Sequence, residues 1–575
     1  MKFNVLARAF DAIDKTSGRT IITGLLADVL REATAQEIEH ICYLALGTLK
    51  PPHIGTQFAI AQKTMIKIVA SLLKQTCQWV EQEAQKTGDL GSVIEQFSWE
   101  GSQELSVEDV YQSLILIEDL NGTGSQEKKS QKVQELLLQL DSLSAKYVVR
   151  IILGTLRLGF SDMTLIDALS WMVTGDKTLR EDIEDAYNVC ADSGLVARAL
   201  KEGGIEAIRA MKIHVGIPIR PAAAERMPDV QSIVDKLGVC VAQPKFDGFR
   251  LQVHVDLTQE TPLIRFFSRN LADMSNMFPE FVSACKALSV KNFIADGEAM
   301  VYDPNTKVFM PFQETVKRRR KHGIDELVSE LPLQLYLFDL LYIDGQSLLD
   351  VAHDERRDIL KKLVASSSGD VLQVIEEKTI HSAQELENYF IQEIASGLEG
   401  LVVKKTHAIY QPGKRNFNWI KLKYQAADKL QDSLDVVIMG YYPGKGKRSQ
   451  FGIGAFLVGI YNSQSDCFET VAKIGTGLTD DQWIELKSFC DALKTTEQPH
   501  NYTCDKSLTP FIWTQPGLVC EVLADQVTLS PVHTAGKTAN HLGFALRFPR
   551  FLRYREDKSS YQVTTVAELE TFYKR

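Results

Sequence analysis

The sequence lacks long apolar runs, clustered cysteines and a strong excess of proline or glycine, and each absence excludes a class of protein. No stretch approaches the roughly 18 consecutive apolar residues of a membrane span. The first 19 residues, MKFNVLARAFDAIDKTSGR, interrupt their apolar side chains with charges and lack the apolar core of a signal peptide. The nine cysteines lie at least 14 residues apart, so CxxC and zinc-finger spacings are absent. Such unpatterned thiols favour a reducing, cytoplasmic compartment, and no membrane partner is expected.

The size and charge of the chain leave several classes open. Its 575 residues exceed what one hydrophobic core supports and indicate roughly three to five domains. The net charge of −10 argues superficially against a nucleic-acid partner. However, residues 411–450 hold eight Lys/Arg and only three Asp, and RFPRFLRYREDK (547–558) holds five Lys/Arg against two acids. Segregated charge can bind phosphates despite an acidic total, although a solvated surface is the alternative for either segment.

The hydrophobic pattern changes twice along the chain. Residues 1 to about 210 carry apolar side chains at helical spacing, with the polar stretch NGTGSQEKKSQK (121–132) as a mobile loop between two helices. The prolines of IPIRPAAAERMP (217–228) predict an extended linker. Beyond it, short strands mix with helices up to residue 424, and residues 425–575 favour the strands of a small β-barrel. We therefore expect a multidomain α+β protein with an all-α domain at 1–215, an α+β domain at 216–424 and a β-barrel domain at 425–575.

One short stretch, VAQPKFDGFRLQVHV (241–255), suggests covalent chemistry. After Arg250 the side chains alternate between apolar and polar over residues 251–256, which is the period of a half-buried strand. Lys245, Asp247 and Gly248 therefore lie at the mouth of a sheet, where the lysine amine can act as a nucleophile once it loses its proton. A K-x-D-G string also arises by chance, so the rest of the chain must supply partners for it.

Further strings carry charged or aromatic side chains that would suit phosphate chemistry. Taken singly, each has a structural alternative: an aromatic in an apolar strand is usually a core residue, a glutamate at a strand start is usually solvated, and two lysines spaced by two usually form an exposed face. In chain order the strings are FFSRN (266–270) with Arg269, ADGEAMVYD (295–303) with Glu298, YLFDLLYIDG (336–345) with Phe338, EGLVVKK (399–405) with Glu399, and GKRNFNWIKLK (413–423) with Arg415, Lys421 and Lys423.

Together and in this order, these strings resemble the nucleotidyltransferase motifs of the ATP-dependent DNA ligases, in the three-domain form of the archaeal and eukaryotic replicative branch. The KxDG string with Lys245 is similar to the first motif and RFPRFLRYREDK to the sixth, with the others between them in the family's order. The stretch SAKYVVRIILGTLRLGFSDMTLIDALS (144–170) resembles the family's helical DNA-binding domain, and LVCEVLADQVTLSPVH (518–533) resembles its OB-fold. The likeness covers nearly the whole chain. It implies a helical DNA-binding domain, a nucleotidyltransferase (adenylation) domain and an OB-fold domain.

The resemblance also implies an activity, cofactors and partners. Such enzymes seal nicks in duplex DNA with ATP and Mg²⁺, by way of a lysine–AMP intermediate, transfer of AMP to the 5′-phosphate and attack by the 3′-hydroxyl. Nicked double-stranded DNA is the expected partner, a sliding clamp is a further candidate, and the enzyme is expected to act as a monomer at the nucleoid. Replication, repair and recombination are the expected settings.

The family's site residues map onto this sequence one by one. Lys245 would be the nucleophile, Glu298 and Glu399 the carboxylates for magnesium, and the basic 547–558 segment the group that orients pyrophosphate. The nucleotide contacts implied by the family motifs are Gln243, Arg250, Arg269, Glu298, Phe338, Arg415, Lys421 and Lys423, with Phe338 stacked under adenine and Arg269 reaching for the 5′-phosphate of the nicked strand.

Gln243 departs from the family pattern, because a glutamate usually stands two residues before the nucleophile. An amide carbonyl can still accept a bond from the adenine amino group, but it carries no charge and the amide also offers a donor. Whether ADP or GTP can replace ATP is therefore left open. Two alternatives remain: an RNA-capping-type nucleotidyltransferase, which shares the lysine motif, and a catalytically inactive DNA-binding clamp. An NAD-dependent ligase with a four-cysteine zinc site is excluded by the cysteine spacing.

Overall fold

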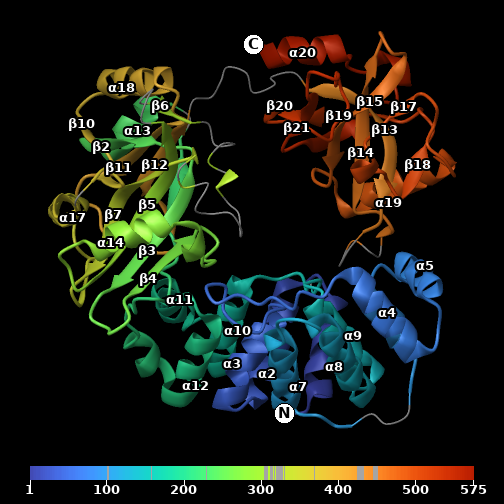
Figure 1. The fold of residues 1–575 in the computed structure, drawn as a ribbon, viewed down its shortest axis with the longest axis horizontal. Coiled ribbons are helices and arrows are strands. Elements are labelled where there is room, and N and C mark those ends of the chain that lie inside the picture. Colours follow the sequence, from blue (N-terminus) through green and yellow to red (C-terminus); the bar gives the residue numbers. More distant parts are fainter. Residues whose placement is uncertain are drawn as a thin grey trace. The chain divides into compact units, whose positions relative to one another are not determined.

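The structure is a computed structural model, and Figure 1 draws its fold. Contacts between residues divide the chain into two compact units. The first comprises Met1–Phe58, Ser106–Asp119 and Phe160–Tyr424, and the second Ala59–Leu105, Leu120–Gly159 and Gln425–Arg575. The described residues are 1–99, 103–156, 158–227, 229–303, 308–310, 315, 317, 318, 328, 330–367, 369–423, 433–444, 448 and 451–574. The predicted boundary between residues 424 and 425 and part of the basic 411–450 segment lie outside them.

The N-terminal third is helical, as the apolar spacing predicts. In α1, for example, Leu6, Phe10 and Ile13 recur at that spacing, and all three are buried. The first unit contains α1 (Phe3–Asp14), α2 (Arg19–Glu32), α3 (Ala35–Ala45), α7 (Val107–Asp119), α10 (Asp162–Thr174), α11 (Arg180–Val189) and α12 (Ser193–Arg209). The second contains α4 (Gln62–Leu73), α5 (Cys77–Thr87), α6 (Leu90–Glu95), α8 (Ser125–Gln139) and α9 (Ser142–Ile152).

The loop predicted at 121–132 is wrong over most of its length. Helix α8 begins at Ser125, and only the glycine-containing residues 121–124 remain outside it. The polar Gln, Glu and Lys residues that suggested a loop are good helix formers. Further along α8, the burial of Val133, Leu136 and Leu137 stabilises the helix.

Two sheets form the α+β part of the first unit. One has strand order β4-β3-β5-β7-β8, with β6 paired to β5 and β9 to β7; the other has order β1-β12-β11-β2-β10. The first is built from β3 (Phe249–Asp256), β4 (Leu263–Ser268), β5 (Asn292–Asp303), β6 (Val308–Phe309), β7 (Leu333–Ile343), β8 (Gln346–Ser347) and β9 (Leu372–Val374). The second is built from β1 (Ala223–Arg226), β2 (Cys240–Lys245), β10 (Lys378–Ile380), β11 (Gly400–Lys405) and β12 (Arg415–Lys423).

Each sheet has an apolar core on one face. Leu251, Val253 and Val255 of β3 join a core with α14 (Pro279–Lys286) and α17 (His353–Ala365). Alternate residues of β2, β11 and β12 join a second core with α13 (Val230–Leu237) and α18 (Ala383–Ala395), which Figure 1 shows beside these strands.

Two sequence expectations about this part are wrong. Strand β3 is buried on both faces, because Gln252 and His254 are also covered. Their side chains hydrogen-bond the preceding chain: the backbone N–H of Ile219 donates to Gln252 Oε1 at 2.7 Å, and that of Gly216 donates to His254 Nδ1 at 3.1 Å. The segment predicted as a linker contains strand β1, which pairs in parallel with β12, so this segment is part of the sheet.

The C-terminal part of the second unit consists mainly of strands, in agreement with the sequence. In the described residues an eight-stranded sheet runs β16-β18-β13-β14-β15-β17, with β19 pairing both β13 and β22, and β20 pairs with β21. The elements are β13 (Leu434–Tyr442), β14 (Ala455–Asn462), β15 (Cys467–Ile474), α19 (Asp480–Ala492), β16 (Lys494–Thr495), β17 (Tyr502–Thr503), β18 (Ile512–Thr514), β19 (Val519–Leu523), β20 (Gln526–Ser530), β21 (Gly543–Arg547), β22 (Arg550–Tyr554) and α20 (Val566–Lys574). Within the part of the chain that is described, no helix combines the length and apolarity needed to cross a bilayer.

Candidate active site

The candidate nucleophile lies on the polar face of the second sheet. Cys240 and Ala242 of β2 point into the core against α13 and α18, so the alternation of the strand places Gln243 and Lys245 on the opposite face. The same alternation in β12, whose Ile420 belongs to that core, brings the next residues of its other face to this side. These are Trp419, Lys421 and Lys423.

A row across three strands joins Lys245 to Lys423. Gly400 of β11 pairs with Lys245 on one side and with Lys423 on the other. Its φ of +146° is open to glycine, and a Cβ there would lie 2.1 Å from the carbonyl oxygen of Leu422. A side chain is therefore excluded between the two lysines.

Glu399, the residue before that glycine, connects both lysines. Its backbone N–H donates to the carbonyl of Lys245 at 3.1 Å, while its carboxylate accepts one hydrogen bond from Lys245 Nζ and another from Lys423 Nζ. Desolvation would raise the pKa of Glu399, but the two ammonium groups outweigh it and lower that pKa. Glu399 is therefore an ionised carboxylate shared by two cations.

The first sheet contributes the facing wall. Arg250 of β3 pairs with Glu298 of β5 on the face opposite the apolar core. Arg250 donates to Asp296 Oδ2 at 2.8 Å and to the carbonyl of Ala222 at 2.9 Å, and its guanidinium lies 5.4 Å from the Phe338 ring. These contacts hold Arg250 in one orientation, and its Nε is buried without a hydrogen-bond partner among the described residues.

The two polar faces meet at an aromatic pair. The rings of Phe338 from β7 and Trp419 from β12 lie edge to face, with centroids 6.0 Å apart. Lys404 of β11 lies 5.2 Å from the first ring and 4.4 Å from the second, and its Nζ donates to the carbonyl of Phe338 at 3.0 Å. The site therefore lies between the sheets.

Glu298 lies at this junction beside the KxDG segment. The N–H of Gly248 donates to Glu298 Oε1 at 3.2 Å, and a Cβ on that glycine would lie 2.3 Å from the carbonyl oxygen of Ala299. Burial raises the pKa of Glu298 to about 7, against the opposing effect of Lys245 and Arg250. Because residue 248 is a glycine, its backbone N–H comes close enough to hydrogen-bond Glu298, the side chain whose pKa is raised.

A second group of cations surrounds Lys421 of β12. Lys421 has its pKa lowered by desolvation and then by the charges of Arg415, Lys423, Arg226 and Arg269. Arg269 and Arg415 are exposed, at the end of β4 and the start of β12. These two arginines are exposed, whereas Arg250 is half-buried and is held by Asp296 and the carbonyl of Ala222.

Gln243 has a partner that the sequence did not indicate. This side chain is 2% exposed, and its Nε2 donates to Glu377 Oε2 at 2.7 Å. Glu377 precedes β10, the strand that pairs with β2 on the side away from β11. No motif marks Glu377, because the contact joins positions 134 residues apart.

Other residues that the sequence did not indicate are buried next to the site residues. Asp339 of β7 is buried and bonded by Arg356 at 2.7 Å, and Asp296 accepts the Tyr410 hydroxyl at 2.7 Å. Burial alone would raise the pKa of Asp339, but Arg356 and Lys404 hold it well below the usual range. The acids interrupt apolar strands, which was the one available signal.

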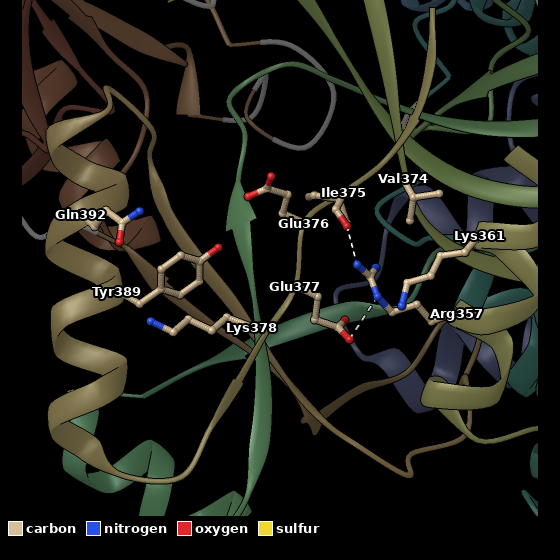
Figure 2. A pocket seen from close by; sticks show the side chains of 9 residues that line it. All are labelled: Arg357, Lys361, Val374, Ile375, Glu376, Glu377, Lys378, Tyr389 and Gln392. Carbon is tan, nitrogen blue, oxygen red and sulfur yellow. Dashed lines mark hydrogen bonds and ion pairs between the residues drawn. The ribbon is translucent and has the colours of Figure 1, made fainter. Parts of the chain in front are cut away.

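Next to Glu377 lies a cavity of about 610 Å³, drawn in Figure 2. Its lining residues are Arg357, Lys361, Val374, Ile375, Glu376, Glu377, Lys378, Tyr389 and Gln392. None of the residues predicted from the sequence to bind nucleotide or metal is among them. The cavity is therefore distinct from the group around Lys245.

The basic segment 547–558 belongs to the second unit, where most of its cations are paired. Arg550 bonds Asp525 at 3.0 Å, Arg553 bonds Glu521 at 2.5 Å, and Arg555 and Lys558 both bond Asp435. Arg547 is exposed, and its guanidinium lies 5.2 Å from the ring of Phe548.

The oxygen donors of the site show whether these residues could hold magnesium. Among the described residues no group of three or more His, Cys, Asp or Glu is arranged to hold a metal. Mg²⁺, however, commonly takes one or two carboxylates together with substrate phosphates and waters. Glu298 and Glu399 supply two hard oxygen donors that both interact with Lys245, and they fit that pattern.

Family models match three consecutive parts of the chain. The model described as "DNA ligase N terminus" matches residues 2–170, "ATP dependent DNA ligase domain" matches residues 221–423, and "ATP dependent DNA ligase C terminal region" matches residues 449–558. All the site residues predicted between 243 and 423 fall within the second match.

Similar proteins align over the full chain. A "Probable DNA ligase" of Dictyoglomus turgidum is 42% identical over 576 residues, covering 100% of this chain and 98% of the relative. "DNA ligase 2" of Thermofilum pendens is 36% identical over 594 residues, covering 100% and 97%. The solved structure named Pmar-Lig_PreS3 has a TM-score of 0.55 at 15% identity, covers 96% of this chain and 99% of its own, and thus shares the fold. The three matched parts and the full-length identity lead to one conclusion: this chain belongs to the family of ATP-dependent DNA ligases.

Proposed function

We propose that this ligase seals nicks in duplex DNA with Lys245 as the nucleophile that carries AMP. The observation that supports this best is the convergence of Lys245, Glu399 and Lys423 on one sheet face, opposite Glu298 and Phe338 of the other sheet. A lysine, two carboxylates, a further cation and an aromatic ring are the groups that nucleotidyl transfer needs.

The first step forms the covalent intermediate. An ordinary lysine is mostly protonated at neutral pH, so Lys245 Nζ must lose a proton before its lone pair can attack the α-phosphorus of ATP. The new N–P bond replaces the bond to pyrophosphate, which leaves with its electron pair. Lys423 competes with Lys245 for Glu399, which weakens the hold of that carboxylate on the nucleophile. Lys421 and Lys423 offset the negative charge that builds on the α-phosphate.

Two transfers follow on DNA. An oxygen of the 5′-phosphate attacks the same phosphorus, and Lys245 leaves as the amine. The 3′-hydroxyl then attacks the activated 5′-phosphate, loses its proton, and expels AMP as the strand is sealed. Glu298 and Glu399 would hold a magnesium ion, which would supply positive charge to offset that of the phosphates.

The remaining residues hold the nucleotide. Phe338 provides a ring on which adenine stacks, and Gln243 faces the base edge from β2. Arg250, whose guanidinium lies 5.4 Å from the Phe338 ring, contacts the ribose. Arg415 contacts the nucleotide phosphates, and Arg269 contacts the 5′-phosphate of the nicked strand. Exposed Arg547 orients pyrophosphate in the first step.

The three matched parts divide the work on DNA. Residues 1–215 form the helical DNA-binding domain, 216–424 the adenylation domain, and 425–575 an OB-fold domain whose barrel is built around β13, β14 and β15. Because a nick differs little from intact duplex, affinity comes mainly from phosphate contacts and groove shape. The enzyme acts as a monomer, and a sliding clamp is its candidate protein partner.

Labelled nucleotide tests this function directly. The protein is incubated with α-³²P-labelled ATP or GTP and resolved by denaturing electrophoresis. The proposal requires a labelled AMP adduct that is lost in Lys245→Ala, while binding of nicked duplex persists. An undiminished adduct in that variant would overturn the assignment of the nucleophile, and a GMP adduct alone would point to a capping enzyme.

A further inference from the structure

The Gln243–Glu377 bond fixes the direction of an amide next to the nucleophile. The side chain of Glu377 is 10% exposed, and its carboxylate contacts three polar side chains. Gln243 Nε2 lies 2.7 Å from Oε2, His353 Nε2 lies 2.8 Å from the same oxygen, and Arg357 Nε lies 3.2 Å from Oε1. Figure 2 shows the contact with Arg357, which also donates to the carbonyl of Ile375 at 2.6 Å.

This environment keeps Glu377 ionised. Desolvation would raise its pKa, but His353 and Arg357 outweigh that effect and lower the pKa of Glu377. An ionised carboxylate can only accept hydrogen bonds. The amide nitrogen of Gln243 must therefore face Glu377, because a reversed amide would set its carbonyl oxygen against the carboxylate. The Gln243 carbonyl oxygen consequently points away from Glu377.

We propose that Glu377 is a positioning residue that gives this ligase its choice of base: by fixing the Gln243 amide, it makes the site accept a 6-amino purine and reject a 6-oxo purine. This inference rests on the proposed function, in which Gln243 faces the base edge. A carbonyl oxygen accepts a hydrogen bond from the amino group of adenine, whereas it opposes the carbonyl oxygen of hypoxanthine or guanine. The selectivity lost with the usual glutamate is thus recovered through a second carboxylate.

The test compares two nucleotides that differ at C6. Self-adenylation and self-inosinylation of the full chain are measured with α-³²P-labelled ATP and ITP, and the ratio of the two second-order rate constants gives the base preference. Glu377→Ala releases the amide, so this preference should fall about tenfold, the usual effect of one hydrogen bond that must be left unmade. Glu376→Ala is the matched control, since this neighbour also lines the cavity, is exposed, and has no hydrogen bond to Gln243 among the described contacts. It should keep the wild-type preference.

A pair of substitutions guards against simple misfolding. Gln243→Glu sets two carboxylates against each other and should weaken reaction with ATP. Adding Glu377→Gln to that variant exchanges donor and acceptor, so the amide of residue 377 can donate to the new carboxylate. The reaction with ATP should recover in the double variant, while Glu377→Gln alone should show a reduced preference for ATP over ITP.

The outcomes separate this inference from the proposed function. If wild-type protein forms no adduct, or if Lys245→Ala keeps it, the proposed function fails. If the wild-type adduct forms at Lys245 but Glu377→Ala keeps the ATP:ITP ratio, only the role of Glu377 is overturned. An equal loss of rate with ATP and ITP would show that Glu377 merely supports the fold, which also overturns the inference.

Discussion

Replacing Glu298 by glutamine should change how the stability of the catalytic unit depends on pH. Burial raises the pKa of Glu298 to about 7, from an ordinary value of 4.5. Between these two values the native state keeps a proton that the unfolded chain has lost. Wild-type stability therefore declines as pH rises through this window, by about 1.4 kcal/mol per unit and about 3 kcal/mol in all. The amide cannot ionise, so Glu298→Gln escapes this loss.

The assay is urea unfolding of both proteins at several pH values, without nucleotide or metal. The difference between the two free energies of unfolding at pH 4.5 serves as the reference. By pH 8 this difference should have shifted by about 3 kcal/mol in favour of the variant. Glu376→Gln serves as the control, because that carboxylate is exposed and lies outside the site. A Glu298→Gln difference that stays the same from pH 4.5 to pH 8 would refute the argument that burial sets this pKa.

Four other results are expected. Nick sealing should stop in EDTA and return with Mg²⁺, and robust sealing in chelator would contradict a metal role. Glu399→Ala should lower the sealing rate by orders of magnitude, because the site loses both a metal carboxylate and the partner of two lysines. Arg547→Ala should slow reaction with ATP far more than sealing of a nick that already carries AMP, because pyrophosphate leaves only in the former; equal loss in both assays would argue for a structural role. Asp339→Asn should lower the free energy of unfolding by about 3–5 kcal/mol in thermal or urea denaturation, because it leaves the buried Arg356 guanidinium unbalanced, and an unchanged midpoint would show that this pair contributes little.

Local sequence patterns predicted helices and strands well where burial of one apolar face stabilises the element. The helical spacing of residues 1–209 and the strands that hold Glu298, Phe338 and Lys423 are found where the sequence indicated them. Polar stretches were harder. The start of α8 and strand β1 were missed, because helix-forming polar residues and short extended segments are stabilised by contacts with distant parts of the chain.

The second face of β3 illustrates why burial is difficult to infer from alternation. Gln252 and His254 have the polarity of a solvated face, yet both are covered. They are accommodated because their side chains bond backbone groups near residues 216–219, an arrangement that satisfies polar atoms inside the protein. Composition alone does not distinguish such a face from an exposed one.

The sequence by itself determined the family and the chemistry, because the order and spacing of reactive side chains are local properties of the chain. It determined that Lys245 is the candidate nucleophile, that two carboxylates and a lysine pair accompany it, and that Gln243 departs from the usual pattern. Only the tertiary structure decided how these groups interact. Glu399 is 154 residues from Lys245 along the chain, and Glu377 is 134 residues from Gln243, yet each pair is in hydrogen-bond contact. Whether a carboxylate is ionised, and which way an amide points, depends on desolvation and on neighbours brought together from distant strands. No local pattern records those contacts.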